Sequence, residues 1–304
     1  MTDLLVRLSE FEIWYNEQLT TTNLHNFNVD DYINEVAYSV KRQFTDRSGQ
    51  RSYIGASALS RPDVLLGLMK LGYPYISKPY ALSTSSIFHL GDVFEALILN
   101  MMNAFGLKVT GEQSEIRIPD SDVYGHIDGL VDELDAVVEV KTMATSYFKS
   151  FVKKPDNYRG YLTQLAVYKY CMGKRNAFWV CFDKETSRVK TVVPDEELLQ
   201  QYWESSLLRA QSIRSFKTIE DVVLLDPPDP IPEVYKKQET GRLMLPTSMR
   251  YTPYYEAFYN TSIGTDNYRH SKVYVDGLVT SPEKRIERIN NVKKQMEKLY
   301  GHTV

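Results

Sequence analysis

The stretch VYGHIDGLVDELDAVVEVKTM, residues 123–143, places an aspartate, a glutamate and a lysine inside two valine-rich runs. The β-branched residues on both sides of the polar segment DELD, residues 132–135, predict a β-hairpin. With the turn centred in the middle of DELD, position 128 pairs with position 139. Because side chains alternate between the faces of a strand, Asp128, Glu139 and Lys141 then share one face and the neighbouring valines occupy the other.

Two carboxylates in directly opposed positions are an unusual feature of a sheet. Cβ atoms of opposed residues lie roughly 5 Å apart. At that distance Asp128 and Glu139 repel by on the order of 3 kcal/mol at an effective dielectric of about 20. A divalent cation between the side chains reverses the sign, because Mg²⁺ prefers hard oxygen ligands. An exposed hairpin with ordinary surface charges is the alternative, and a register slip of one residue would separate the pair.

Length and composition are those of a chain with a substantial core. The 304 residues are 43% hydrophobic and 12% aromatic, enough for one large domain or a core domain with additions. No apolar run approaches the ~18 residues of a membrane span. The N-terminal sequence lacks the charged-then-apolar pattern of a secretion signal, so a cytoplasmic location is expected, in the host if the chain is viral. The two cysteines, Cys171 and Cys181, are too few for a four-cysteine zinc or iron–sulfur site.

Charge is distributed unevenly along the chain. The net charge of −3 does not by itself suggest nucleic-acid binding. Residues 149–175 nevertheless carry a local charge of +6, with Asp156 as the only acidic residue. The basic residues of this segment are Lys149, Lys153, Lys154, Arg159, Lys169, Lys174 and Arg175. A solvated helix face is the ordinary interpretation, and a surface for phosphates is the alternative.

Hydrophobic periodicity predicts an α/β core with a mixed central β-sheet flanked by helices. The predicted domains are a helical segment at 1–50, a core at 51–217 and an extension at 218–304. Within them the expected elements are two helices in 1–50, helices at 57–72 and 86–106, strands near 112–118, 123–131 and 136–142, a helix at 158–173, strands at 176–183 and 188–194, and a helix at 195–216. For the helix at 57–72, Ser57 or Ser60 is the expected N-cap, with Pro62 in the first turn.

The C-terminal extension begins with a proline-rich run. Four prolines lie within residues 227–232, which predicts a stiff connector. A tyrosine-rich stretch follows that is expected to be irregular, and a terminal helix is predicted from Ser281. The extension is expected to pack along the core.

Three further polar residues lie on the predicted helices. Glu95 borders the apolar stripe of its helix, and Gly91 one turn earlier leaves room near its side chain. Gln164 and Tyr168 are spaced i, i+4 on the basic helix and share a face with Tyr161. Rings and amides beside cations suit a nucleic-acid strand. Each feature alone is more often ordinary packing.

Taken in order, these residues resemble a known family. An acidic residue on a helix after glycine, then Asp, then Glu-x-Lys, then Gln-x-x-x-Tyr is the pattern of the PD-(D/E)XK nucleases, and the chain looks like their RecB-type and lambda-exonuclease-like branch. The matching residues are Glu95, Asp128, Glu139, Lys141, Gln164 and Tyr168. The resemblance covers residues 55–185 and implies a restriction-endonuclease-like core. Some relatives carry an iron–sulfur cluster, and some have a histidine at the position of Glu95. The family pattern offers no match for the tail after Pro227.

The resemblance implies a role for each matching residue. Glu95, Asp128, Glu139 and the carbonyl of Val140 would hold Mg²⁺, for which Mn²⁺ would substitute. Lys141 would orient the attacking water and offset phosphate charge. Gln164 would orient the lysine or the nucleotide. Tyr168 would support the DNA strand, with further DNA contacts from Lys149, Lys153, Lys154 and Arg159.

Recognition of a DNA end is the second expectation that follows. Related exonucleases hold a terminal phosphate with a serine and an arginine from the region of Ser57 and Arg61. The implied activity is a Mg²⁺-dependent DNA exonuclease of phage type that acts in DNA degradation, recombination or replication, with a recombinase or single-strand-binding protein as a candidate partner. The alternatives are a structure-selective endonuclease of the same fold and a non-catalytic DNA-binding accessory protein. A requirement for a free DNA end would distinguish the exonuclease from the endonuclease. The accessory protein would be recognised by the loss of one or more of the metal-binding residues.

Overall fold

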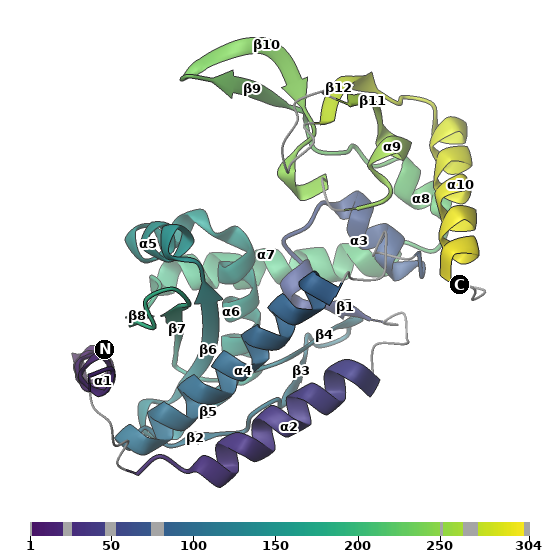
Figure 1. The fold of residues 1–304 in the computed structure, drawn as a ribbon. Helices are drawn as coiled ribbons and strands as arrows, with labels where there is room; N and C mark the ends of the chain where they lie inside the picture. Colours follow the sequence, from purple (N-terminus) through teal and green to yellow (C-terminus); the bar gives the residue numbers. More distant parts are fainter. Residues whose placement is uncertain are drawn as a thin grey trace. The chain divides into compact units, whose positions relative to one another are not determined.

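A computed structural model describes residues 2–20, 26–45, 53–73, 82–249, 252–263 and 273–300 (Figure 1). The chain divides into two compact units. The first contains residues 1–49, 55–60 and 80–210, and the second contains residues 50–54, 61–79 and 211–304. The described residues 61–73 therefore group with the C-terminal part of the chain, whereas the sequence placed them in the core. The packing of the extension on the core stays a prediction.

The first unit is built on a five-stranded sheet with the strand order β2-β5-β6-β7-β8. Its strands are β2 (Val109–Thr110), β5 (Gly129–Val131), β6 (Ala136–Met143), β7 (Asn176–Asp183) and β8 (Val189–Val192). β6 and β7 run parallel, and the other neighbours run antiparallel. The predicted mixed α/β fold class is confirmed.

Helices cover both faces of this sheet. The helical elements of the unit are α1 (Thr2–Gln18), α2 (Val29–Thr45), η1 (Ala56–Ala58), α4 (Leu82–Phe105), η2 (Asp132–Leu134), α5 (Thr145–Lys153), η3 (Pro155–Asn157), α6 (Arg159–Cys171) and most of α7 (Glu196–Ser215). α1 and α4 share one core with alternate residues of β6 and β7, among them Val138, Val140 and Phe178. α6 packs against β6 and β7 as well. β6 and β7 are buried along nearly their whole length, because a central strand covered on both faces needs a continuous apolar run.

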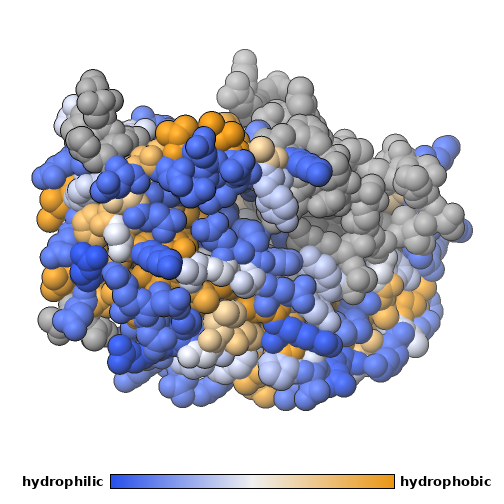
Figure 2. Space-filling view, turned by 90° about the horizontal axis from the view of Figure 1, so that it is seen from below, coloured by the Kyte–Doolittle hydropathy of each residue, from blue (hydrophilic) through white to orange (hydrophobic). Residues whose placement is uncertain are grey.

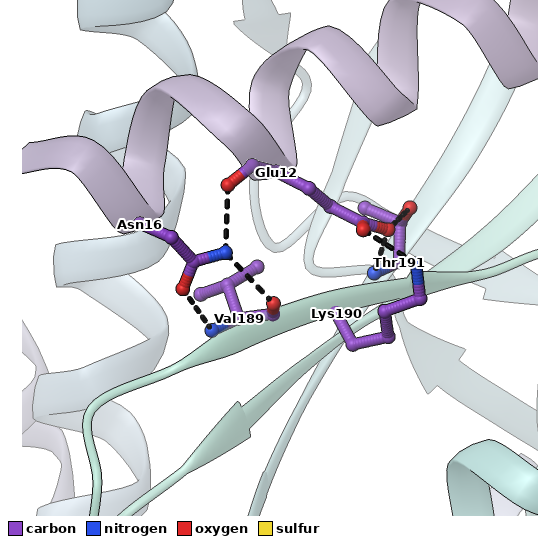
Figure 3. Close-up of polar contacts among 5 residues, drawn as sticks. All are labelled: Glu12, Asn16, Val189, Lys190 and Thr191. Atoms are coloured by element: carbon purple, nitrogen blue, oxygen red, sulfur yellow. Dashed lines mark hydrogen bonds and ion pairs between the residues drawn. The ribbon is translucent and has the colours of Figure 1, made fainter.

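The edge strand β8 is covered by polar side chains of α1 (Figure 3). Glu12 accepts the backbone N–H of Thr191 through Oε1 at 2.7 Å and pairs through Oε2 with Lys190 at 2.5 Å. Asn16 exchanges hydrogen bonds with the backbone of Val189, at 3.4 Å and 3.5 Å. An edge strand presents unpaired backbone groups to other chains. The two side chains satisfy three of those groups and fix α1 to the sheet.

A short hairpin precedes the strand β5. β3 (Glu115–Arg117) pairs antiparallel with β4 (Val123–His126), with Ile116 opposite Gly125. The chain leaves this pair after His126 and enters the five-stranded sheet at Gly129. Residues 127 and 128 therefore lie between two sheets.

The second unit has its own sheet and helices. They are α3 (Asp63–Lys70), α8 (Ile219–Val223), β9 (Ile231–Tyr235), β10 (Gln238–Met244), η4 (Thr247–Met249), α9 (Tyr255–Phe258), β11 (Tyr259–Ile263), β12 (Val273–Leu278) and α10 (Pro282–Tyr300), and β1 (Ile54–Gly55) lies at the boundary. The strand order is β11-β12-β10-β9. Arg285 is buried and donates to the carbonyls of Val279, Val223 and Leu225, which links α10 to the segments around it.

Two expectations, one for the stretch after the prolines and one for the start of α3, were wrong. The stretch after the prolines is not irregular, because it contains most of a four-stranded sheet, and Pro232 itself lies in β9 opposite Leu243. α3 begins at Asp63 with Pro62 at the N-cap, so neither Ser57 nor Ser60 caps it. Ser57 lies instead in the short η1. Proline at the N-cap disfavours the helical conformation of the residue directly before it, which here is Arg61.

The surface face drawn in Figure 2 is mainly hydrophilic, with smaller hydrophobic patches between the charged residues. Among the helices in the described ranges, none has the length and apolar character needed to cross a membrane.

Candidate active site

The site lies where the β5–β6 hairpin stops pairing. Gly129 stands opposite Val138, and Val131 stands opposite Ala136, which is the register that the sequence predicted. The ladder ends at Gly129, and one further step of the same register brings Asp128 opposite Glu139. Both side chains are buried, at 8% and 2% exposure. The two carboxylates are therefore in the core of the first unit and not on an exposed hairpin.

The carboxylate of Asp128 takes the place of a backbone carbonyl of β5 at this point. Its Oδ2 accepts the backbone N–H of Val140 at 2.7 Å, a group that a longer β5 would have paired. The N–H and C=O of one strand residue point toward the same neighbour. The carbonyl of Val140 is thus directed to the same edge of β6 as the Asp128 carboxylate.

Glu139 has one paired and one unpaired oxygen. Oε1 accepts a hydrogen bond from Nζ of Lys141 at 2.6 Å. Oε2 is buried and has no hydrogen-bond partner in the part of the chain that the structure describes. Buried polar atoms are nearly always satisfied, so an orphaned carboxylate oxygen calls for a ligand, a water or an ion.

A hydrogen-bonded chain runs from Glu139 into helix α6. Nζ of Lys141 also donates to Oε1 of Gln164 at 3.1 Å, and Nε2 of Gln164 donates to the hydroxyl of Tyr168 at 3.0 Å. Gln164 and Tyr168 are one turn apart, so a single helix face supplies both. Tyr168 is only 4% exposed. This burial argues against the direct DNA contact expected of Tyr168 and leaves it as an internal support for Gln164.

Burial and mutual repulsion shift the titration of these groups. Burial, followed by the charges of Glu139 and Glu95, raises the pKa of Asp128 well above its ordinary value. Burial also raises the pKa of Glu139, although the ammonium of Lys141 opposes the shift. For Lys141, burial alone would lower the pKa, but the carboxylates of Glu139 and Asp128 outweigh it and hold the pKa above the ordinary lysine value.

Glu95 approaches the pair from helix α4. It is half-buried, and its charge contributes to the raised pKa of Asp128. Nε2 of Gln113 donates to Oε1 of Glu95 at 3.0 Å. Sequence reasoning missed Gln113, because it lies in a turn without any recognisable pattern. Gly91 has room near it as predicted, since among the described residues a Cβ there would meet only Thr142 Oγ1, at 3.9 Å.

Two glycines beside Asp128 permit the close packing of the site. A Cβ on Gly125 would stand 2.7 Å from Cε1 of Tyr168, and a Cβ on Gly129 would stand 2.4 Å from Cγ1 of Val109. Both distances are shorter than real side chains tolerate. The pair of glycines in the sequence GHIDG was the available signal for this close approach.

The donor set has the chemistry of a magnesium site but not its complete geometry. Carboxylate oxygens are the ligands that Mg²⁺ prefers. Oε2 of Glu139, which has no hydrogen-bond partner among the described residues, is available as such a ligand. Within the described ranges, however, no group of three or more His, Cys, Asp or Glu side chains is close enough to hold a metal ion. The residues therefore offer the oxygen ligands that Mg²⁺ prefers, from two adjacent carboxylates and from Glu95 nearby.

The basic segment downstream is only partly available to a ligand. Lys149, Lys153, Lys154 and Arg159 are exposed, and none is paired with a carboxylate among the described residues. Lys169 is instead buried and bonded to Glu196, and Lys174 pairs with Asp132 at 2.9 Å. These last two residues do not belong to a free basic surface.

The expected end-binding residues are assigned to different units. Ser57 is exposed in η1 and belongs to the first unit, whereas Arg61 is half-buried and belongs to the second. Their joint contact with a terminal phosphate stays a prediction.

No protein-family model and no curated protein matches the chain. Among solved structures, LHK-Exo in complex with dAMP is 16% identical and has a TM-score of 0.41, covering 55% of this chain and 90% of its own. The alkaline exonuclease LHK-Exo from Laribacter hongkongensis is also matched at 14% identity and a TM-score of 0.35, covering 58% and 93%. A phage-related exonuclease from Haemophilus somnus 129PT is 13% identical with a TM-score of 0.35, covering 53% and 92%.

Proposed function

We propose that this protein is a Mg²⁺-dependent DNA exonuclease of the PD-(D/E)XK type. The observation that carries the proposal is the buried pair Asp128 and Glu139, held beside the ammonium of Lys141 where the hairpin ladder ends. Burying two carboxylates beside one ammonium costs desolvation free energy that their pairing offsets only in part, and a bound cation would offset more of it. Perturbed ionisable groups gathered at one point are typical of functional sites.

The metal would be held by the carboxylates of Asp128 and Glu139, together with Glu95 and the carbonyl of Val140. When bound, such an ion lowers the pKa of a coordinated water and neutralises charge on the scissile phosphate. Oε2 of Glu139 is buried without a hydrogen-bond partner among the described residues, which supports its place among the ligands. Gln113, which donates to Glu95, would fix that side chain on the ion.

Lys141 would orient the attacking water and balance phosphate charge. Its raised pKa keeps the side chain protonated at every physiological pH, so the ammonium has no free lone pair with which to act as a general base. Two acceptors, Oε1 of Glu139 and Oε1 of Gln164, direct two of its three N–H groups. The third N–H remains for water or a phosphate oxygen.

DNA would approach along the exposed cations of α5 and the start of α6. Lys149, Lys153, Lys154 and Arg159 would contact phosphates, which gives affinity without sequence preference. The requirement for a free end, which separates an exonuclease from an endonuclease of the same fold, is part of this proposal. Roles in DNA degradation, recombination or replication are proposed from the sequence resemblance alone.

Digestion of three labelled DNAs tests the proposal. Linear duplex, single-stranded and covalently closed circular DNA are incubated with the protein in Mg²⁺ and in EDTA. We expect Mg²⁺-dependent release of nucleotides from linear DNA, intact circles, and no release by Glu139→Gln. Glu133→Gln is the matched control, because Glu133 is an exposed carboxylate of the same hairpin. Cleavage of circles as fast as linear DNA would favour the endonuclease, and absence of any cleavage would overturn the proposal.

A further inference from the structure

A cluster of aromatic rings leads from the central sheet to the surface beside the candidate active site. Phe151 of α5 is fully buried and lies edge-on to Trp179 of β7, with ring centroids 5.2 Å apart. Tyr158 and Tyr161 pack edge-on against Phe151 at 4.9 Å and 5.5 Å. Phe151 therefore anchors α5, and the two tyrosines pack on a fully buried ring.

Tyr147 forms the outer end of this cluster. It lies one turn before Phe151 on α5, so the two rings share a helix face. Its ring contacts Tyr158 and Tyr161 with centroid distances of 4.9 Å and 6.4 Å. Its side chain is 42% exposed, whereas the rings behind it are half-buried or buried. A rigidly supported aromatic ring thus faces solvent.

The cluster is in direct contact with the candidate active site. Nζ of Lys141 lies 4.9 Å from the ring centroid of Tyr161, which is a cation–π distance. Tyr147 is therefore one ring removed from the lysine that would face the scissile phosphate. The proposed roles of the carboxylates and of Lys141 do not explain why an exposed tyrosine lies beside them.

The same two helices carry the exposed cations. Lys149, Lys153 and Lys154 are on or next to α5, and Arg159 opens α6. Asp156 is the only acidic residue within 145–171. An exposed ring among exposed cations combines the two contacts that a single nucleic-acid strand makes, which are base stacking and phosphate pairing.

We propose that Tyr147, supported by Tyr158 and Tyr161, is a stacking subsite for an unpaired nucleobase next to the phosphate that is cut. This inference rests on the proposed nuclease function and adds to it that the strand is unpaired at the site. A base inside a duplex has no free face for the ring, whereas every unpaired base has one. The subsite therefore accepts any base and excludes paired ones.

Binding of a fluorescein-labelled single-stranded DNA 12-mer, measured by anisotropy in Ca²⁺, tests the subsite. We expect Tyr147→Ala to weaken binding by about tenfold, as loss of one base–aromatic stack does. Tyr147→Phe keeps the ring and should bind like wild type. Tyr38→Ala is the matched control, because Tyr38 is a 62% exposed tyrosine on α2, and should have no effect.

A second 12-mer with abasic sites at its terminal nucleotides isolates the stacking contact. On this DNA, wild type and Tyr147→Ala should bind equally, because the base that the ring would stack on is absent. A terminal 2-aminopurine should be quenched on binding to wild type, a readout that needs no variant. Equal binding of the intact 12-mer by Tyr147→Ala and wild type, a difference that persists on abasic DNA, or unquenched 2-aminopurine would overturn the subsite. Failure of the proposed function would appear separately, as loss of Mg²⁺-dependent digestion by wild type.

Discussion

Val140 donates its backbone N–H to Oδ2 of Asp128 across 2.7 Å, immediately beyond the last pair of the β5–β6 ladder. A side-chain carboxylate thus stands where a strand carbonyl would stand in a longer hairpin. The consequence is a buried acid held against Glu139, with hydrogen bonding to one of its oxygens already supplied by the fold. Removing the charge of Asp128 and removing its side chain should therefore have different effects.

Asp128→Asn should abolish activity and stabilise the metal-free protein at alkaline pH. Because the folded-state pKa of Asp128 is raised, the folded state retains a proton that the unfolded chain loses. Stability therefore falls as pH rises from the ordinary carboxyl pKa of about 4 through the raised value. Asparagine cannot ionise and keeps an oxygen for Val140. Urea unfolding of wild type and Asp128→Asn in EDTA across pH 5–9 measures this difference. A wild type that gains stability relative to Asp128→Asn as the pH rises would contradict the prediction.

Glu139→Gln should lose the stabilisation that Mg²⁺ gives to wild type. A ligand present at 100 times its dissociation constant stabilises the folded state by about 2.7 kcal/mol. Thermal melting of wild type, Glu139→Gln and the hairpin control Glu133→Gln, each with EDTA and with Mg²⁺, gives the comparison. Equal wild-type melting in both conditions, with activity surviving the substitution, would refute the metal site.

Lys141→Arg should lose most turnover while DNA binding in Ca²⁺ stays near wild type. The substitution retains the charge, but a planar guanidinium cannot occupy the position between Glu139 and Gln164 that a compact ammonium holds. Lys174→Arg is the matched control, since Lys174 is also a partly buried, paired lysine. Normal turnover of Lys141→Arg would reduce the lysine to a simple electrostatic contact.

Tyr168→Phe should lower turnover without changing the affinity for DNA. The hydroxyl of Tyr168 accepts from Gln164, which in turn positions Lys141, so its loss loosens the lysine. Loss of one such hydrogen bond costs about 1 kcal/mol of stability. Steady-state kinetics and anisotropy separate the two effects. A selective loss of DNA affinity would show that Tyr168 contacts the strand after all.

Gly125→Ala should destabilise the protein by about 1–3 kcal/mol, the usual cost of overpacking. Its Cβ would stand 2.7 Å from Cε1 of Tyr168 and 3.2 Å from the Cβ of Ala56. Gly91→Ala is the matched control, because Gly91 is in helix α4 with space around it, and alanine there should stabilise by about 0.5–1 kcal/mol. Denaturant unfolding of both variants measures the difference. Equal stability of the two variants would mean that Tyr168 moves aside at no cost.

The hairpin and its register followed from the sequence alone. Polar DELD between valine-rich runs specifies a local turn, and a local turn sets the pairing of residues close to it. The same local information predicted the core helices, because apolar periodicity within one segment decides them. The shared face of Glu139 and Lys141 is a direct consequence, seen in their 2.6 Å hydrogen bond.

Tertiary structure alone decided the features that depend on distant segments. The pairing of Gln113 with Glu95, the burial of Tyr168 and the contact of Tyr161 with Lys141 each join residues from different elements. The sheet of β9–β12 and the grouping of residues 61–73 with the C-terminal part were likewise not foreseen. Local periodicity states which face of a segment is apolar, but it does not state which other segment covers that face. That choice is made by packing across the whole chain, and it determined which tyrosine became internal support and which remained exposed.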